Sequence, residues 1–224
     1  MNITEFAGMV EATAVQYNMA EEEIIELMDL VNRYRFKAYA VMPEYEELAE
    51  RLLKEAGNDV TVKLCGIDFP DGTSPTEEKI ARIKHYLKKG VGEIDIFNNI
   101  DFVKSGNYEA MADELRQLVA AAGEGMVTKV IIETPKLSDE EIVMAARTVM
   151  ESGVSFVKTA SGYYGPTTLH HVELINETLK GRIGIKAAGG IRDLETIEKM
   201  MANGVTRFGI GIRGIKGIIK ELEK

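Results

Sequence analysis

The stretch from Val154 to Ala187, VSFVKTASGYYGPTTLHHVELINETLKGRIGIKA, holds a short apolar run, a longer amphipathic segment and a second short apolar run. Runs and segments of this kind alternate along the whole chain, which is typical of βα units around a parallel sheet. The two runs, Val154–Lys158 and Ile183–Ala187, are expected to be strands. Each carries a lysine at or near its end, Lys158 and Lys186.

Six further runs bring the number of expected strands to eight. They are Met9–Val15, Phe36–Met42, Val60–Gly66, Glu93–Phe97, Lys129–Glu133 and Arg207–Ile210. The first is the weakest, because Glu11, Ala12 and Thr13 interrupt its apolar character. Eight strands favour a closed barrel over an open sheet. The expected fold is therefore α/β, a single (β/α)8 TIM barrel spanning residues 1–224 with a short N-terminal helix.

Helices are expected between these strands, where apolar residues recur at helical spacing. One begins at Ser138, whose hydroxyl precedes three acidic residues, a pattern that caps a helix and suits its dipole. Others are expected at Glu44–Ala56, Thr76–Lys89 and Asn107–Ala122, and a glycine that can end a helix stands directly after each: Gly57, Gly90 and Gly123.

Composition excludes several classes of partner. The chain has 224 residues and a formal net charge of −9, which opposes attraction to nucleic acid and to anionic lipid. No segment has the apolar length of a membrane span, and residues 1–20 lack a signal-peptide pattern, so the protein is expected to be cytoplasmic. Cys65 is the one cysteine and is expected in the core, so no disulfide, metal or cofactor is expected.

The active site of such a barrel lies at the C-terminal ends of its strands, which makes polar residues there the candidates. Lys158 and Lys186 would stand close together, and each would disfavour the other's charge. A lowered pKa gives the neutral amine that adds to a carbonyl. Asp95, within Glu93-Ile-Asp-Ile-Phe, is then a carboxylate that can shuttle protons. The alternative is that the lysines are solvated strand ends and that Asp95 is an acid that serves a helix dipole or a salt bridge.

A second pattern is glycine-rich and follows the last two expected strands. It comprises Ala187-Ala-Gly-Gly-Ile-Arg-Asp and Phe208-Gly-Ile-Gly-Ile-Arg-Gly. Backbone amides in such loops bind phosphate in barrels, so Gly189, Gly190 and Gly211 are candidate phosphate contacts, with Arg213 as a source of charge. Tight strand-to-helix turns also use glycine, which is the alternative explanation.

Five motifs resemble those of deoxyribose-phosphate aldolases and occur in that family's order. They are Phe69-Pro-Asp-Gly, Glu93-Ile-Asp, Lys129-Val-Ile-Ile-Glu-Thr, Val157-Lys-Thr-Ala-Ser-Gly and Gly184-Ile-Lys-Ala-Ala-Gly-Gly-Ile-Arg. The resemblance implies that Lys158 forms a Schiff base, that Lys186 tunes it and that Asp95 relays protons. Thr159 joins the candidate substrate-binding residues. The implied activity is that of a class I aldehyde-lyase, joining acetaldehyde reversibly to glyceraldehyde 3-phosphate to give 2-deoxyribose 5-phosphate.

The chain departs from this resemblance at four places. Glu11-Ala-Thr stands where Asp-His-Thr is common, and Ala40 where a cysteine is common. Ile210-Gly-Ile replaces the usual hydroxyl side chains of the phosphate loop, and Tyr163 and Tyr164 stand where the family often has lysine or phenylalanine. The lysine chemistry is thus better supported than a phosphorylated acceptor.

Other functions stay open at this point. The same enamine chemistry could serve a different aldehyde acceptor, including a non-phosphorylated one. A sugar-phosphate isomerase or epimerase would share the barrel and the glycine loops but would not need paired lysines. A decayed, non-catalytic aldolase is the third alternative, although the presence of both lysines and Asp95 argues against it. The sequence leaves open a homodimer or a larger homo-oligomer.

Overall fold

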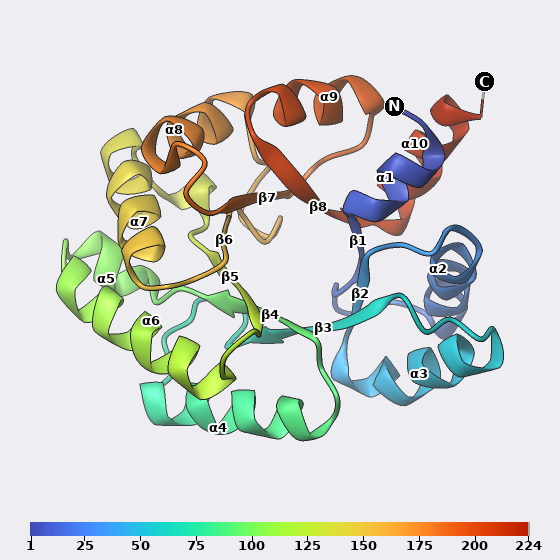
Figure 1. The fold of residues 1–224 in the computed structure, drawn as a ribbon, viewed down its shortest axis with the longest axis horizontal. Helices are drawn as coiled ribbons and strands as arrows, with labels where there is room; N and C mark the ends of the chain where they lie inside the picture. Colours follow the sequence, from blue (N-terminus) through green and yellow to red (C-terminus); the bar gives the residue numbers. More distant parts are fainter. Residues whose placement is uncertain (224) are drawn as a thin grey trace.

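The computed structural model describes residues 1–223, and within them eight parallel strands form one closed barrel. The order of the strands around the barrel is their order in the chain, and β1 closes the ring by pairing with both β2 and β8. Figure 1 shows the barrel with its helices around the outside. This is the (β/α)8 TIM barrel that the alternating runs predict.

The strands are short and the helices between them are longer. The strands are β1 Val10–Ala14, β2 Ala38–Val41, β3 Val62–Ile67, β4 Glu93–Phe97, β5 Val127–Ile131, β6 Phe156–Lys158, β7 Gly184–Ala188 and β8 Val205–Gly211. The helices are α1 Ile3–Met9, α2 Glu21–Tyr34, α3 Glu46–Glu55, α4 Thr76–Lys88, α5 Ile100–Lys104, α6 Tyr108–Ala122, α7 Asp139–Glu151, α8 Leu169–Leu179, α9 Leu194–Ala202 and α10 Ile212–Leu222, with 3-10 turns at Pro43–Tyr45 and Thr134–Lys136.

All eight expected strands are confirmed, and so is the short N-terminal helix, α1. The expected boundaries differ most at β5, which occupies Val127–Ile131 where residues 129–133 are predicted. Glu133 lies beyond the strand in the left-handed region, with φ of 60°. Ser138 caps α7 as predicted, accepting a hydrogen bond from the backbone N–H of Glu141.

Apolar side chains fill the space between the barrel and the helices, and few of them fill the barrel itself. The larger hydrophobic cluster takes the outward residues of the strands, such as Ile94, Val157 and Ile185. A small second cluster of Ala38, Ala40 and Leu64 lies on the inward faces of β2 and β3. Because strand side chains alternate between the two faces, charged residues on the inward face are left to occupy much of the barrel interior.

The barrel wall is loosest between β2 and β3. These strands pair at two positions, Ala38 with Val62 and Tyr39 with Lys63. By contrast, β4 and β5 pair along five residues. The C-terminal halves of β2 and β3 therefore diverge toward the mouth of the barrel.

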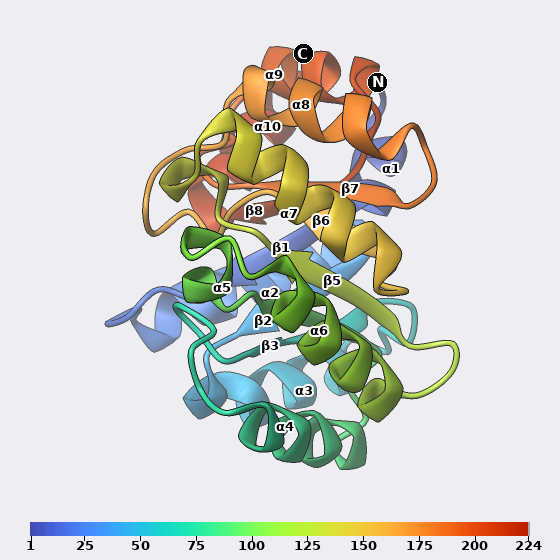
Figure 2. The same ribbon diagram turned by 90° about the vertical axis from the view of Figure 1, so that its left-hand side faces the viewer.

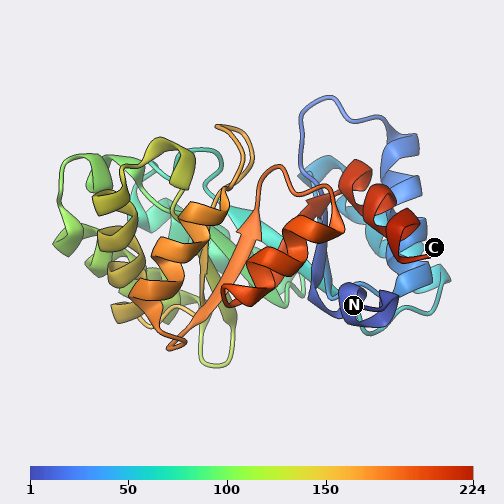
Figure 3. The ribbon, with the colours of Figure 1, turned by 90° about the horizontal axis from the view of Figure 1, so that it is seen from above.

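Both chain ends lie on one side of the barrel, beside α1 and α10 (Figures 2 and 3). In Figure 2, α3 and α4 lie at the far end of the molecule from them. None of the helices within residues 1–223 has the length and apolar character that a membrane span needs.

Candidate active site

Lys158 and Lys186 meet at one carboxylate oxygen. Lys158 Nζ lies 2.7 Å from Asp95 Oδ2, and Lys186 Nζ lies 2.6 Å from the same atom. The two lysines are register partners on β6 and β7, so their inward side chains start side by side. Lys186 is 0% exposed, Asp95 4% and Lys158 9%. The fold thus brings together the three residues that the sequence predicts as catalytic.

Further charged side chains surround this trio inside the barrel. Lys129 Nζ lies 2.6 Å from a Glu93 carboxylate oxygen and 3.4 Å from Asp95 Oδ1. Glu11 forms an ion pair with Lys186, and its other oxygen lies 3.5 Å from Lys129 Nζ. We call the connected set the charged core: Glu11, Glu93, Asp95, Lys129, Lys158, Lys186 and Arg207.

The charge count of the charged core leaves one positive charge in excess. Four cationic side chains face three carboxylates, all of them within ion-pair distance of an opposite charge. A buried charge without its own partner is costly, and the usual escape is a shifted pKa. The set becomes neutral when one lysine gives up its proton. Its composition therefore favours one neutral amine.

The lowered pKa falls on Lys186. Burial lowers the pKa of Lys186 to about 8, and Lys158 and Lys129 act in the same direction against Asp95 and Glu11. Burial works to raise the pKa of Asp95, but the three lysines outweigh it and hold this pKa well below its usual range. At neutral pH Asp95 is thus a carboxylate, able to accept hydrogen bonds from both neighbouring amines.

The charged core is possible because small residues stand opposite long ones. On β8, a Cβ added to Gly209 would lie 3.0 Å from the Cβ of Ala188 and 3.4 Å from Cε of Lys186. Glycine at this position leaves the space across which the Lys186 side chain lies. The strand register also contributes, because Lys129 on β5 is the partner of Asp95 on β4, and the two opposite charges lie side by side.

Four members of the charged core are not among the predicted site residues: Glu11, Glu93, Lys129 and Arg207. Their common signal is a charged residue at an inward position of a strand. Glu93 shows it most simply, because it stands two residues before Asp95 and so faces the same way.

A cavity of about 200 Å³ opens beside Lys158 at the C-terminal mouth, and Asp95 also lines it. Aromatic rings border the cavity: the ring centroid of Phe69 lies 4.6 Å from that of Tyr163 and 5.2 Å from that of Phe97. The Tyr163 hydroxyl donates a hydrogen bond of 2.7 Å to the Val15 carbonyl. The loop after β6 is thereby tied to the loop after β1, and the mouth is narrowed by apolar surface.

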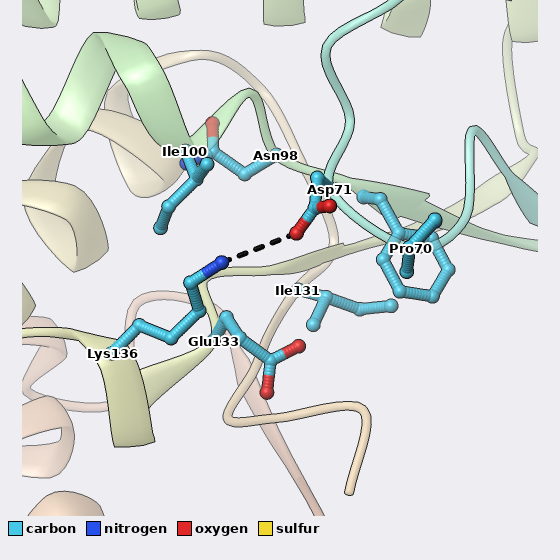
Figure 4. A pocket seen from close by; sticks show the side chains of 8 residues that line it. Pro70, Asp71, Asn98, Ile100, Ile131, Glu133 and Lys136 are labelled. Carbon is cyan, nitrogen blue, oxygen red and sulfur yellow. Dashed lines mark hydrogen bonds and ion pairs between the residues drawn. The ribbon is translucent and has the colours of Figure 1, made fainter. Parts of the chain in front are cut away.

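The neighbouring Tyr164 anchors the same loop on the other side. Its hydroxyl donates to Asp71 Oδ1 at 2.7 Å, and Lys136 Nζ lies 3.2 Å from that oxygen and 4.0 Å from the Tyr164 ring centroid. Figure 4 shows Lys136 reaching Asp71 beside a cavity of about 10 Å³, roughly the space that one water requires. Glu133 borders this small cavity, and its carboxylate accepts the backbone N–H of Ser161 at 3.2 Å.

The loops after β6 and β7 are held against each other. The Thr159 hydroxyl lies 2.7 Å from the Thr167 hydroxyl and donates to the Ala188 carbonyl at 3.2 Å. Gly189 and Gly190 have φ of 97° and 78°, a backbone conformation that favours glycine. Thr159 is buried and serves this loop contact, so its role in binding substrate stays a prediction.

The other glycine loop leads directly into α10. Gly211 is the N-cap of α10 and has no side chain to bond the amides of the first turn. A Cβ added to Gly214 would lie 2.6 Å from the Ile191 carbonyl oxygen, so this first turn packs against the loop after β7. Arg213 is exposed on the same turn. The fold brings the two glycine loops together, and phosphate binding there stays a prediction.

Cys65 is buried on the outward face of β3 and belongs to the larger hydrophobic cluster. The predicted core position of this cysteine is confirmed. Burial raises the pKa of its thiol to about 12. Among residues 1–223, His, Cys, Asp and Glu side chains form no group of three or more that could hold a metal ion.

A TIM barrel with a charged core inside it, and with Lys158 at the C-terminal end of β6 facing a cavity at the mouth, has the architecture of a TIM-barrel enzyme. No protein-family model matches the chain. Over 221 residues it is 34% identical to the deoxyribose-phosphate aldolase of Klebsiella pneumoniae, covering 98% of this chain and 88% of that protein. It is 37% identical over 221 residues to the deoxyribose-phosphate aldolase of Thermococcus kodakarensis, covering 97% and 98% of the two chains.

Solved structures agree with these relatives. QR15, an aldolase, has a TM-score of 0.85 and 32% identity, covering 100% of this chain and 96% of that one. The tetrameric deoxyribose phosphate aldolase of Aeropyrum pernix has a TM-score of 0.85 at 23% identity, covering 100% and 93%. The chain belongs to the deoxyribose-phosphate aldolase family and is an aldehyde-lyase.

Proposed function

We propose that the protein is a class I aldolase that joins acetaldehyde to glyceraldehyde 3-phosphate through an imine on Lys158, giving 2-deoxyribose 5-phosphate reversibly. The observation that carries the proposal is the pair of amines on one oxygen, Asp95 Oδ2. Lys158 lines the cavity, whereas Lys186 and Lys129 are fully buried. A carbonyl compound that enters the mouth therefore meets the Lys158 amine.

Formation of the imine needs a neutral Lys158. Lys186, with a pKa of about 8, is the proton acceptor: a proton passes from Lys158 to Lys186 by way of Asp95 Oδ2, which contacts both. The free amine then attacks the carbonyl carbon and a C–N bond forms. The carbonyl oxygen takes one proton from the amine and one returned by Lys186 through Asp95, and it leaves as water. The product is a protonated imine on Lys158.

The same relay produces the nucleophilic carbon. A proton leaves the carbon next to the imine and passes through Asp95 to neutral Lys186, which gives an enamine. The enamine carbon attacks the acceptor aldehyde, and the new alkoxide takes the proton back from Lys186. Water then hydrolyses the imine and releases the product, and the reverse sequence cleaves it.

The acceptor phosphate is proposed to bind at the two glycine loops. Backbone amides around Gly189, Gly190 and Gly211 and the first turn of α10 are suitable donors, with Arg213 supplying charge and Thr159 holding the neighbouring loop.

A second candidate function is the same reaction with a non-phosphorylated acceptor. Residues 210–212 offer no hydroxyl, and the aromatic border at Tyr163 suits an apolar aldehyde.

A non-catalytic role is less well supported. Burying charged groups is often less favourable to stability than packing apolar residues of similar volume. A purely structural barrel would gain little from the charged core.

We further propose a cytoplasmic protein that acts in deoxyribose phosphate breakdown as a homo-oligomer. The Aeropyrum pernix protein is tetrameric.

The proposal is tested by measuring acetaldehyde released from 2-deoxyribose 5-phosphate and from unphosphorylated 2-deoxyribose. Lys158→Met should abolish release. Lys79→Met is the matched control, because Lys79 is also 0% exposed and ion-paired, with Glu114 at 2.8 Å, but lies on α4 outside the barrel. Release that survives in Lys158→Met would overturn the assignment. Faster release from the unphosphorylated sugar would favour the second candidate.

A further inference from the structure

The cavity beside Lys158 continues through the barrel wall between β2 and β3. From the second position at which these strands pair onward, it is lined by residues from both faces of the sheet. Ala40 and Leu64 belong to the inward cluster, whereas Tyr39 and Cys65 belong to the cluster between the barrel and the helices. We call this part of the cavity the wall cavity. It connects the reactive amine with the layer of α3 and α4.

The wall cavity is mainly apolar along its length and polar where it ends. Val41, Met42 and Leu64 line it, and Ala40 keeps it open because alanine adds no bulk beyond Cβ. At its outer end Glu46 Oε2 lies 3.3 Å from Lys63 Nζ, so the charges of these two side chains compensate each other. Roughly 10–15 Å³ is enough for one water. The whole cavity, at about 200 Å³, is large enough for a small organic molecule.

We propose that the wall cavity binds the alkyl chain of the carbonyl compound that forms the imine, so that the protein uses linear aliphatic aldehydes longer than acetaldehyde as donors. This inference rests on the proposed function, since it extends the donor bound to Lys158. The covalent step is unchanged: the C–N bond forms at the aldehyde carbon and the oxygen leaves as water. Each methylene moved from water to an apolar site improves binding by about fourfold.

The position of the wall cavity assigns it to the donor and not to the acceptor. In the closed ring of eight strands within residues 1–223, β2 and β3 stand opposite β6 and β7 (Figure 1). The glycine loops proposed for the acceptor phosphate follow β7 and β8. An imine on Lys158 thus has the acceptor site on one side and the wall cavity on the other.

The test is a competition between donors of different length on the unmodified protein. Equimolar acetaldehyde and butanal are added without acceptor, imines are reduced with borohydride, and adducts are located by peptide mass spectrometry. Butanal has two more methylenes, so its adduct on Lys158 should exceed that of acetaldehyde by about 15-fold. Exposed lysines, such as Lys84, report the intrinsic reactivity of the two aldehydes.

The outcomes separate the two proposals. If the two aldehydes label Lys158 in the same ratio as they label exposed lysines, the donor proposal is overturned and the aldolase proposal stands. No adduct on Lys158 with either aldehyde overturns the aldolase proposal and this inference with it.

Two substitutions in the wall cavity provide a second measurement, the change in donor preference at Lys158. Loss of stability alone cannot produce the expected result. Ala40→Leu fills the wall cavity and should shift the preference back toward acetaldehyde by about 15-fold. Leu64→Ala enlarges it and should extend the preference to hexanal. Both changes disturb packing, yet the expected shifts are opposite in sign. Shifts in the same direction, or no shift in either variant, would overturn the inference.

Discussion

Replacing Lys129 with methionine should raise the pKa of Lys186 and thereby lower activity at neutral pH. Lys129 Nζ lies 3.4 Å from Asp95 Oδ1, and Lys186 Nζ lies 2.6 Å from Oδ2 of the same carboxylate. The two amines are therefore at most about 8 Å apart. At that separation and an effective dielectric constant of about 20, two positive charges repel by about 2 kcal/mol, equal to about 1.5 pKa units.

The pKa of Lys186, about 8 with Lys129 present, should thus rise to about 9.5 in Lys129→Met. The proposed reaction needs one neutral amine, so activity rises with pH up to this pKa and is constant above it. At a pH below the pKa of Lys186, each unit by which this pKa rises lowers kcat/KM tenfold. The expected rise of about 1.5 units should therefore lower kcat/KM at pH 7 about 30-fold. Raising the pH should restore most of the loss. The charge count gives the same direction, since three cations would then face three carboxylates.

The assay is the pH profile of kcat/KM for cleavage of 2-deoxyribose 5-phosphate. Lys79→Met is the control, because it removes a buried, ion-paired lysine that has no contact with the charged core. It should lower the free energy of unfolding and leave the midpoint of the acid limb unchanged. An unmoved midpoint in Lys129→Met, or an equal movement in Lys79→Met, would refute the electrostatic argument.

Three other variants test the proton relay, the phosphate site and the role of Ala40 separately. Asp95→Asn should lower kcat by about 10²–10⁴, because the relay is lost. It should also lower the free energy of unfolding in urea by about 3–5 kcal/mol, because buried lysines lose a partner; full activity would make Asp95 structural. Arg213→Ala should raise KM for glyceraldehyde 3-phosphate about tenfold and leave KM for glyceraldehyde unchanged; equal effects on both would remove Arg213 from the phosphate site. Crotonaldehyde should spare the unmodified enzyme, whose Cys65 has a pKa raised to about 12 by burial, and inactivate Ala40→Cys. Residual activity and peptide mapping decide this, and equal inactivation would contradict it.

The fold is predictable from the chain because the outward faces of the strands are mostly apolar, with exceptions such as Lys63 and Thr128. The two weakest predictions share one cause. Glu11 interrupts the apolar pattern of β1, and Lys129 is taken as the beginning of a strand that starts at Val127. Both residues point into the barrel and belong to the charged core. A pattern that equates buried strands with apolar residues therefore fails where the interior is ionic.

The candidate site is predictable in part for the same reason. Lys158, Lys186 and Asp95 stand out because each is a charged residue in an otherwise apolar strand. Their meeting at one oxygen depends on the curvature of the closed sheet, which alternation along a strand does not specify. The wall cavity is beyond sequence reasoning altogether, since it follows from the divergence of β2 and β3 after two paired positions.

Trapping of the imine shows whether Lys158 is the amine that attacks the carbonyl compound. The protein is incubated with acetaldehyde and borohydride, digested, and mapped by peptide mass spectrometry, with Lys158→Met treated in parallel. We expect a reduced two-carbon adduct on Lys158, formed faster than on exposed lysines and faster above pH 8 than below it, following the pKa of about 8 at Lys186. An adduct on Lys186 instead, or no preferential labelling of Lys158, would contradict this expectation.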